Sequence, residues 1–233
     1  MIYVGIDDTD TLDTPGTNQL AKVLVAEVAA DFRCHLILRH QLFSDPRVHF
    51  TSKNGSASIW LEPRREDSPS LSALIATLRR RMLAWYVPGS DPGLCVTREV
   101  PAEVRDYGQR CKCELMNQEM ARILAAKHGI YLEGLGGTEG GVIGSLAAIG
   151  LAAGGDDGRV VVMGDYPDDL QGPTPVSLIR SRGIAVRNLG NSEEITSGTV
   201  DVGKHLRPNY RQRHVVLFAE PVADGIWQGI RLL

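Results

Sequence analysis

The stretch MIYVGIDDTD, residues 1–10, joins an apolar segment to three carboxylates and decides our interpretation of the fold. Residues 1–6 form an apolar, β-branched run that is typical of a buried strand. Asp7, Asp8 and Asp10 follow where such a strand ends, and carboxylates this close repel one another and lose hydration near a core. A hard divalent cation relieves both costs, and Mg²⁺ held by a few carboxylates usually also holds phosphate. The turn is therefore a candidate metal–phosphate site, with Thr9 inside it; the alternative is a solvated acidic turn.

A helix is expected directly after this turn. Residues 18–28, NQLAKVLVAEV, carry a broad apolar stripe at helical spacing. Thr17 is predicted to be the N-cap of this helix, and Gly16 allows a tight entry. The first turn of a helix presents free N–H groups, so a strand, an acidic loop and a helix start in succession favour phosphate binding.

A second segment points to the same chemistry. The run GLGGTEGG, residues 134–141, precedes the apolar, small-residue run VIGSLAAIGL, residues 142–151. Glycines let the backbone approach a ligand closely, and the following helix would again present its N-terminus. We therefore predict a phosphate-binding loop with Gly136, Gly137, Gly140 and Gly141; the alternative is a linker. The run is neither a Walker A loop nor a clean match to the dinucleotide spacing G-x-G-x-x-G.

The remaining periodicity predicts a mixed α+β fold. Helices are expected over 70–86, 114–128 (closed by Gly129) and 175–182, and strands over 35–39, 56–61, 94–96, 130–132, 160–163, 184–186, 198–202, 214–220 and 226–232. Because strands outnumber helices in the C-terminal third, we expect mixed or antiparallel pairing there. Exposed strand edges in that region make a homodimer an open possibility.

Composition narrows the class of protein. With 233 residues the chain can bury a substantial core, and a net charge of −3 supplies no global field that would attract nucleic acid. Local groups of arginines, residues 79–81 and Arg207 with Arg211 and Arg213, are candidate anion sites; the first is more simply a solvated helix face. Cys111 and Cys113 lack the second pair that a structural zinc site needs, so free thiols are expected.

The sequence favours a cytoplasmic protein with no membrane contact. No apolar run reaches the roughly 18 residues that span a bilayer, and the N-terminus does not resemble a signal peptide. Four cysteines in a chain of this length do not indicate a disulfide framework.

Several short segments together resemble the catalytic part of the tRNA(Ile) 2-agmatinylcytidine synthetase family. They are GIDDTD (5–10), Thr17, Leu20-Ala21, Lys53 with Asn54-Gly55, Pro92-Gly93, GVIGSLAAIG (141–150), the strand at 214–221 and Gly229-Ile230-Arg231. The most specific are the Asp-Asp-Thr-Asp and Gly-Val-Ile-Gly segments. In that family a Cys-Thr-Thr follows the acidic turn and carries a threonine that accepts phosphate. Thr17 falls on the first of these threonines, whereas Gly16 and Asn18 depart from the pattern.

The resemblance implies a kinase-like domain with a ferredoxin-like lobe, which we place at residues 1–165 and 166–233. It implies that Asp7, Asp8 and Asp10 handle Mg²⁺ and ATP phosphates, with Thr17 catalytic. Lys53, His40 and Arg39 are candidates for additional positive charge. The family's OB-fold and zinc ribbon, which help to hold tRNA, have no counterpart in this sequence.

Three functions stay open at this point. The leading hypothesis is an ATP- and Mg²⁺-dependent ligase- or kinase-like enzyme that activates an acceptor by phosphoryl or nucleotidyl transfer, with a small molecule such as a cofactor-biosynthesis intermediate as acceptor. The second is tRNA cytidine modification with a separate RNA-binding partner. The third is a non-catalytic nucleotide sensor.

Overall fold

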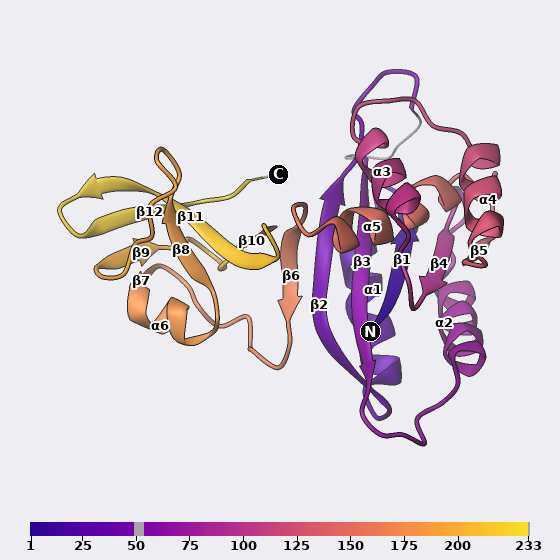
Figure 1. Ribbon diagram of the computed structural model, residues 1–233, viewed down its shortest axis with the longest axis horizontal. Helices are drawn as coiled ribbons and strands as arrows, with labels where there is room; N and C mark the ends of the chain where they lie inside the picture. The colour runs from indigo at the N-terminus through magenta and orange to yellow at the C-terminus, as the bar shows by residue number, and fades with distance from the viewer. Residues whose placement is uncertain (49–53, 233) are drawn as a thin grey trace.

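The computed structural model describes residues 1–48 and 54–232, and within them the strands join into one mixed sheet (Figure 1). The helices are α1 (Thr17–Val28), α2 (Leu71–Trp85), α3 (Ala102–Arg110), α4 (Gln118–Lys127), α5 (Val142–Gly154) and α6 (Val176–Ser181). The strands are β1 (Ile2–Asp7), β2 (Phe32–Gln41), β3 (Gly55–Pro63), β4 (Gly93–Thr97), β5 (Tyr131–Gly134), β6 (Arg159–Met163), β7 (Pro173–Pro175), β8 (Ala185–Asn188), β9 (Thr199–Asp201), β10 (Asn209–Arg211), β11 (His214–Ala223) and β12 (Ile226–Ile230). The mixed α/β class expected from the sequence is confirmed.

The N-terminal part is a three-layer arrangement. Strands β4, β1, β3 and β2 lie side by side, each antiparallel to its neighbour, and the chain reaches them in the order β1-α1-β2-β3-α2-β4. Apolar residues on alternate positions of β1 (Ile2, Val4, Ile6) pack in one core with α1 and α2. Helices α3, α4 and α5 form a second core on the opposite face. The candidate site lies at the end of β1, between these layers.

This β-α-β-β-α-β order is the ferredoxin-like arrangement, and it occupies residues 2–97. We had expected that arrangement in residues 166–233, where the order of elements is β7-α6-β8-β9-β10-β11-β12. In the C-terminal part β11 pairs with β10, β12 and β8, and the last pairing is parallel. The domain boundary between residues 165 and 166 stays a prediction. The sheet is continuous across it, since Asn209 of β10 pairs with Arg159 of β6.

Two local predictions need correction, and one helix was not predicted. Thr17 is the first residue of α1, and Gly16 is its N-cap. Residues 102–110 form α3, which the apolar pattern did not predict because only Val104, Tyr107 and Gly108 of this polar segment are buried. Helix α4 begins at Gln118 rather than near residue 114, because the Asn117 side chain accepts a hydrogen bond from Met120 N. In the described part of the chain, no helix has the length and apolarity needed to cross a membrane.

Candidate active site

Strand alternation and two glycines bring the acidic turn against α5. Tyr3, Gly5 and Asp7 point to the face of β1 that α5 covers. A Cβ at Gly5 would lie 1.9 Å from Ser145 O, so only glycine lets helix and strand approach this closely. A Cβ at Gly144 would lie 1.9 Å from Asp7 Oδ2, so the carboxylate of Asp7 occupies the space beside the first turn of α5. The acidic turn and the glycine segment therefore meet in space.

A cavity of about 260 Å³ opens at this junction. It collects residues that lie far apart in the sequence: the acidic turn, the end of β2, the connection between α3 and α4, and the glycine segment. Its walls are Asp7, Asp8, Asp10, Thr17, Leu42, Phe43, Arg47, Val48, Asn54, Gly55, Asp91, Cys111, Glu114, Leu115, Met116, Thr138, Gly140, Ile143 and Gly144.

Asp10 and Thr17 fix the start of α1 at the cavity wall. Asp10 Oδ1 accepts hydrogen bonds from Thr17 N at 3.2 Å and from Thr17 Oγ1 at 2.9 Å. The buried Thr9 hydroxyl donates to Thr17 Oγ1 at 3.1 Å. Asp10 thus does for the helix what a side-chain N-cap would do, and the hydroxyls of Thr9 and Thr17 are already paired.

The carboxylate of Asp7 is charged only at a cost. Burial against α5, the nearby charge of Asp8 and, more weakly, that of Asp10 raise its pKa from 3.8 to about 8. Asp8 adopts a left-handed backbone conformation with φ 48°, which is uncommon outside glycine. A cation beside Asp7 would therefore stabilise the charged form of this carboxylate.

Asp7 and Asp8 fit a metal ion whose other ligands are phosphate oxygens and water. In the described residues, no three His, Cys, Asp or Glu side chains come together as a metal site, and Asp10 has one oxygen bonded to Thr17. Mg²⁺ usually takes only one or two carboxylates and completes its shell with phosphate oxygens and water. Asp7 and Asp8 match that donor set, and ATP would supply the rest.

The predicted phosphate-binding glycines have different places. Gly140 lines the cavity, together with Thr138 and Gly144. Gly136 packs against the Tyr86 ring, and Gly141 packs against the backbone at Gly93 and Asp7. Gly137 adopts φ 58° and lies under the carboxylate of Asp91. Gly136, Gly137 and Gly141 therefore shape the loop, and Gly140 faces the cavity.

Asp91 is a site residue that sequence reasoning missed. Its Oδ1 accepts from Thr138 N and its Oδ2 from Thr138 Oγ1, both at 2.6 Å. Its backbone O accepts from Gly141 N at 2.9 Å. Asp91 therefore ties the glycine segment to the start of β4. The signal in the sequence was its position directly before Pro92-Gly93. Asp91 precedes β4, which pairs Gly93 with Asp7.

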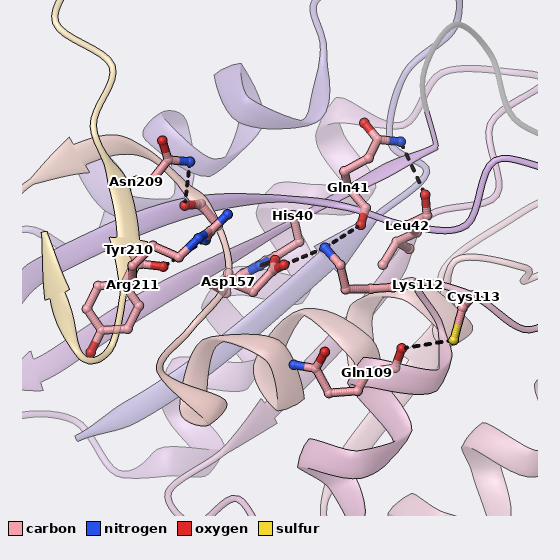
Figure 2. A network of polar contacts seen from close by, with 12 residues as sticks. His40, Gln41, Leu42, Gln109, Lys112, Cys113, Asp157, Asn209, Tyr210 and Arg211 are labelled. Atoms are coloured by element: carbon pink, nitrogen blue, oxygen red, sulfur yellow. Dashed lines mark hydrogen bonds and ion pairs between the residues drawn. The ribbon is translucent and has the colours of Figure 1, made fainter. Parts of the chain in front are cut away.

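The three candidates for additional positive charge lie in different places. Lys53 lies outside the described residues. Arg39 lies next to the cavity, since a Cβ at Gly55 would meet its Nη2 at 2.6 Å. His40 is fully buried on the other face of β2, between Asp157 Oδ1 and Ser58 Oγ, each 2.8 Å away. Figure 2 shows the contact with Asp157. His40 thus belongs to a structural network rather than to the cavity.

Comparison with solved structures identifies the fold. No family model and no curated protein matches the chain. The TiaS–tRNA(Ile2)–ATP complex aligns with a TM-score of 0.56 and 20% identity over 64% of this chain and 36% of that one. A tRNA fluorescent labeling enzyme aligns with a TM-score of 0.56, 20% identity and coverage of 64% and 35%. The TiaS–tRNA(Ile2)–AMPCPP–agmatine complex aligns with a TM-score of 0.54 and 19% identity over 64% of this chain and 35% of that one.

The chain therefore spans about a third of the length of the structures that it matches. A further match, apo TiaS, is described as a tRNA(Ile2) agmatidine synthetase. At this identity the likeness concerns the fold, and it agrees with the resemblance seen in the sequence: the chain has a TiaS-like fold.

Proposed function

We propose that the cavity binds Mg²⁺ and ATP, and that the chain is an ATP-dependent enzyme that activates an acceptor by phosphoryl or nucleotidyl transfer. One observation supports this above all: Asp7, Asp8 and the first turn of α5 line the same cavity. The carboxylates would supply metal ligands, and the N-terminus of α5 supplies the positive end of the helix dipole. Val142 N and Ile143 N already donate to Glu139 O and Gly140 O, so the helix contributes through its dipole more than through these N–H groups.

The chemistry asks the protein mainly for positioning and charge neutralisation. Asp7 and Asp8 would hold Mg²⁺, which when bound neutralises charge on the phosphate oxygens. Burial and Asp8 raise the pKa of Asp7 to about 8 and so favour its protonated form; a cation held at this position would favour the charged form instead. The backbone at Gly140 and Gly144 lines the cavity where the phosphates would lie, Asp91 holds the glycine segment in shape, and Asp10 holds the start of α1.

The acceptor is proposed to be related to tRNA. The matched structures are described as complexes with tRNA(Ile2), with ATP or AMPCPP, and with agmatine. This favours an RNA acceptor over the free small molecule that we expected from the sequence. A separate RNA-binding partner stays part of the proposal.

Isothermal titration with ATP and Mg²⁺ tests the nucleotide site. We expect binding by the wild type and a loss of at least tenfold in affinity for Asp8→Asn, which removes the charge while asparagine tolerates the left-handed backbone. Asp13→Asn is the matched control, because Asp13 is exposed in the same loop and does not line the cavity. No heat from the wild type, or equal affinity in Asp8→Asn, would refute the proposal. Binding without turnover on any tRNA or small acceptor would favour the sensor.

A further inference from the structure

Two arginines lie side by side on the face of the sheet that α1 covers. Strands β2 and β6 are antiparallel neighbours (Figure 1). Arg39 and Arg159 are paired in their register. Their neighbours in sequence, His40 and Val160, point to the opposite face, where Val160 packs with Ala152 of α5. The two guanidinium groups are therefore directed to the same side.

Two more arginines reach this place from the C-terminal part of the chain. Burial and the nearby charges of Arg39, Arg231 and Arg207 lower the pKa of Arg159. Arg207 precedes β10, which pairs with β6, and Arg231 follows β12. Val160 N, next to Arg159, donates to Pro208 O at 2.8 Å, which brings Arg207 beside Arg159. Four arginines from distant parts of the sequence thus gather at one junction, which we call the arginine cluster (Arg39, Arg159, Arg207, Arg231).

The arginine cluster is short of negative partners. In the described part of the chain, Arg207 forms an ion pair with Asp168 at 2.8 Å, whereas no carboxylate forms an ion pair with Arg39, Arg159 or Arg231. The Nε of Arg159 is buried and has no hydrogen-bond partner among these residues. Arg39 has Gln41 Oε1 as a side-chain acceptor, at 3.2 Å. Like charges at close range, with an unpaired buried donor, are unfavourable unless an anion joins them.

The arginine cluster adjoins the nucleotide cavity. Arg39 feels the charge of Asp10, which lines that cavity, and its guanidinium lies beside Gly55, which also lines it. An anion held between Arg39 and Arg159 would therefore be next to the proposed ATP site. Arginine suits a phosphate better than other anions of this size, since its planar fork donates two parallel hydrogen bonds to phosphate oxygens.

We propose that the arginine cluster is a phosphate-binding site that holds a phosphate group of the acceptor beside the nucleotide cavity. The assignment to the acceptor depends on the proposed function; the phosphate site itself does not. The phosphate can belong to a small phosphorylated molecule or to the backbone of a nucleic acid. A bound phosphate would also join the N-terminal sheet to the C-terminal strands, because Arg39 and Arg159 lie on one side of the junction and Arg207 and Arg231 on the other.

The test is a titration with pyrophosphate in EDTA at low salt, followed by calorimetry and by the melting temperature. Without a divalent cation the acidic turn repels phosphate, so this measurement reports on the arginine cluster and not on the ATP site. We expect binding by the wild type and a loss of about tenfold or more in Arg159→Gln and in Arg39→Gln, since hydrogen bonds to charged groups contribute that much. Arg33→Gln is the matched control, because Arg33 lies on the same strand and pairs with Asp165 instead.

The variants also have a readout that a purely structural role would not produce. Removing one of several repelling charges should leave the melting temperature of ligand-free Arg159→Gln equal to or above that of the wild type. The exposed Arg231→Gln, near the end of the chain, gives a second variant with little effect on folding. No binding of pyrophosphate by the wild type, or the same affinity in Arg159→Gln, Arg39→Gln and Arg33→Gln, would overturn the phosphate site even if ATP and Mg²⁺ bind normally.

A short single-stranded RNA in the same titration distinguishes the source of the phosphate. A nucleic-acid phosphate is indicated if the RNA binds more tightly than pyrophosphate and if its affinity depends on salt. Arg159→Gln and Arg231→Gln should then reduce this salt dependence. Binding of pyrophosphate that equals or exceeds that of the RNA indicates a small phosphorylated acceptor. Loss of ATP binding with retained phosphate binding would refute the proposed function and leave the phosphate site standing.

Discussion

At the scale of single residues, Asp7 is an acidic side chain at a position where burial disfavours a negative charge. Asp7 follows an apolar strand, packs beside Gly144 of α5 and has Asp8 as its neighbour. A solvated turn would not hold a carboxylate in this way. Function is the simplest reason for keeping an acidic group at this position, because ligand binding supplies the compensating positive charge.

This predicts how stability depends on pH in the absence of metal. The pKa of Asp7 is raised by burial and by Asp8 from 3.8 to about 8, so the folded protein binds a proton that the unfolded chain releases. Stability therefore falls as the pH rises from about 4 to about 8. In EDTA at pH 8, Asp7→Asn should melt several degrees above the wild type, since about 1 kcal/mol shifts the melting temperature by about 2–4 °C at this size. At pH 5 the difference should shrink.

Thermal melts of both proteins at the two pH values, with Asp13→Asn as control, check this prediction. A variant that melts below the wild type at pH 8 would contradict it. The same substitution should weaken binding of ATP with Mg²⁺, so stability and binding should change in opposite directions.

Which residues the sequence could identify depends on how local their signal is. Asp7, Asp8 and Asp10 were found because a strand, its end and the acids lie within 10 residues. Asp91 and Arg159 were not, because each acts on residues from another part of the chain: Asp91 on Thr138, and Arg159 beside Arg39. The first contact joins two loops and the second depends on strand register, and neither is visible in one sequence.

At the scale of elements, α5 is the part that makes the site possible. Its small residues let it cross β1 closely, and most of its side chains are buried. This helix was predicted well because its composition is uniformly apolar. Helix α3 was missed because it packs on α5 through glycine: a Cβ at Gly108 would lie 2.8 Å from Leu151 N. A contact of that kind leaves no apolar stripe in the sequence.

The close contact between α5 and Asp7 can be tested without changing any charge. Gly144→Ala places a methyl group where Asp7 Oδ2 lies, so it should displace the carboxylate and weaken binding of ATP with Mg²⁺ by tenfold or more. Gly154→Ala is the control in the same helix, since its Cβ would meet nothing nearer than 3.9 Å, and it should leave binding unchanged. Equal affinity in the two variants, measured by calorimetry, would contradict the role of α5.

The start of α1 gives a second test at this scale. Asp10→Ala removes the acceptor of two hydrogen bonds from Thr17 and should lower the free energy of unfolding by about 1 kcal/mol. Asp10→Asn keeps an oxygen at that position and should recover most of this loss in urea denaturation. An alanine variant as stable as the wild type would show that the helix start does not depend on Asp10.

At the scale of the whole molecule, a buried polar network holds the junction beside the cavity. Asp157, at the turn between α5 and β6, bonds His40 of β2 and also Lys112, which in turn donates to Gln41 O at 3.2 Å (Figure 2). Lys112 lies next to Cys111, and Leu42 lies next to Gln41; both neighbours line the cavity. The network thus connects the cavity wall to the strands that lead to the C-terminal part.

Breaking this network should destabilise the fold in a manner that depends on pH. Burial alone would raise the pKa of Asp157, but His40 and Lys112 outweigh it and lower the pKa below 3.8. The stability that this carboxylate contributes is full above pH 4 and is lost as the pH falls through the lowered pKa. At pH 7, Asp157→Asn should cost about 2 kcal/mol, less than a fully buried pair because Lys112 reaches solvent.

Urea denaturation of Asp157→Asn at pH 7 and pH 3 measures both effects. Asp156→Asn is the control, because the neighbouring Asp156 is exposed and asparagine keeps the oxygen that accepts from Gln212 N. A cost that is equal at the two pH values, or absent at pH 7, would contradict this role of Asp157.

The central claim is that the acidic turn and the first turn of α5 hold one metal–triphosphate unit between them. A crystal structure with Mn²⁺ and a non-hydrolysable ATP analogue tests it most directly, because the anomalous signal of manganese locates the ion. We predict a manganese peak between the carboxylates of Asp7 and Asp8, with phosphate oxygens completing its shell beside Gly140 and Gly144. A nucleotide bound elsewhere, with no metal at Asp7 and Asp8, would contradict the claim.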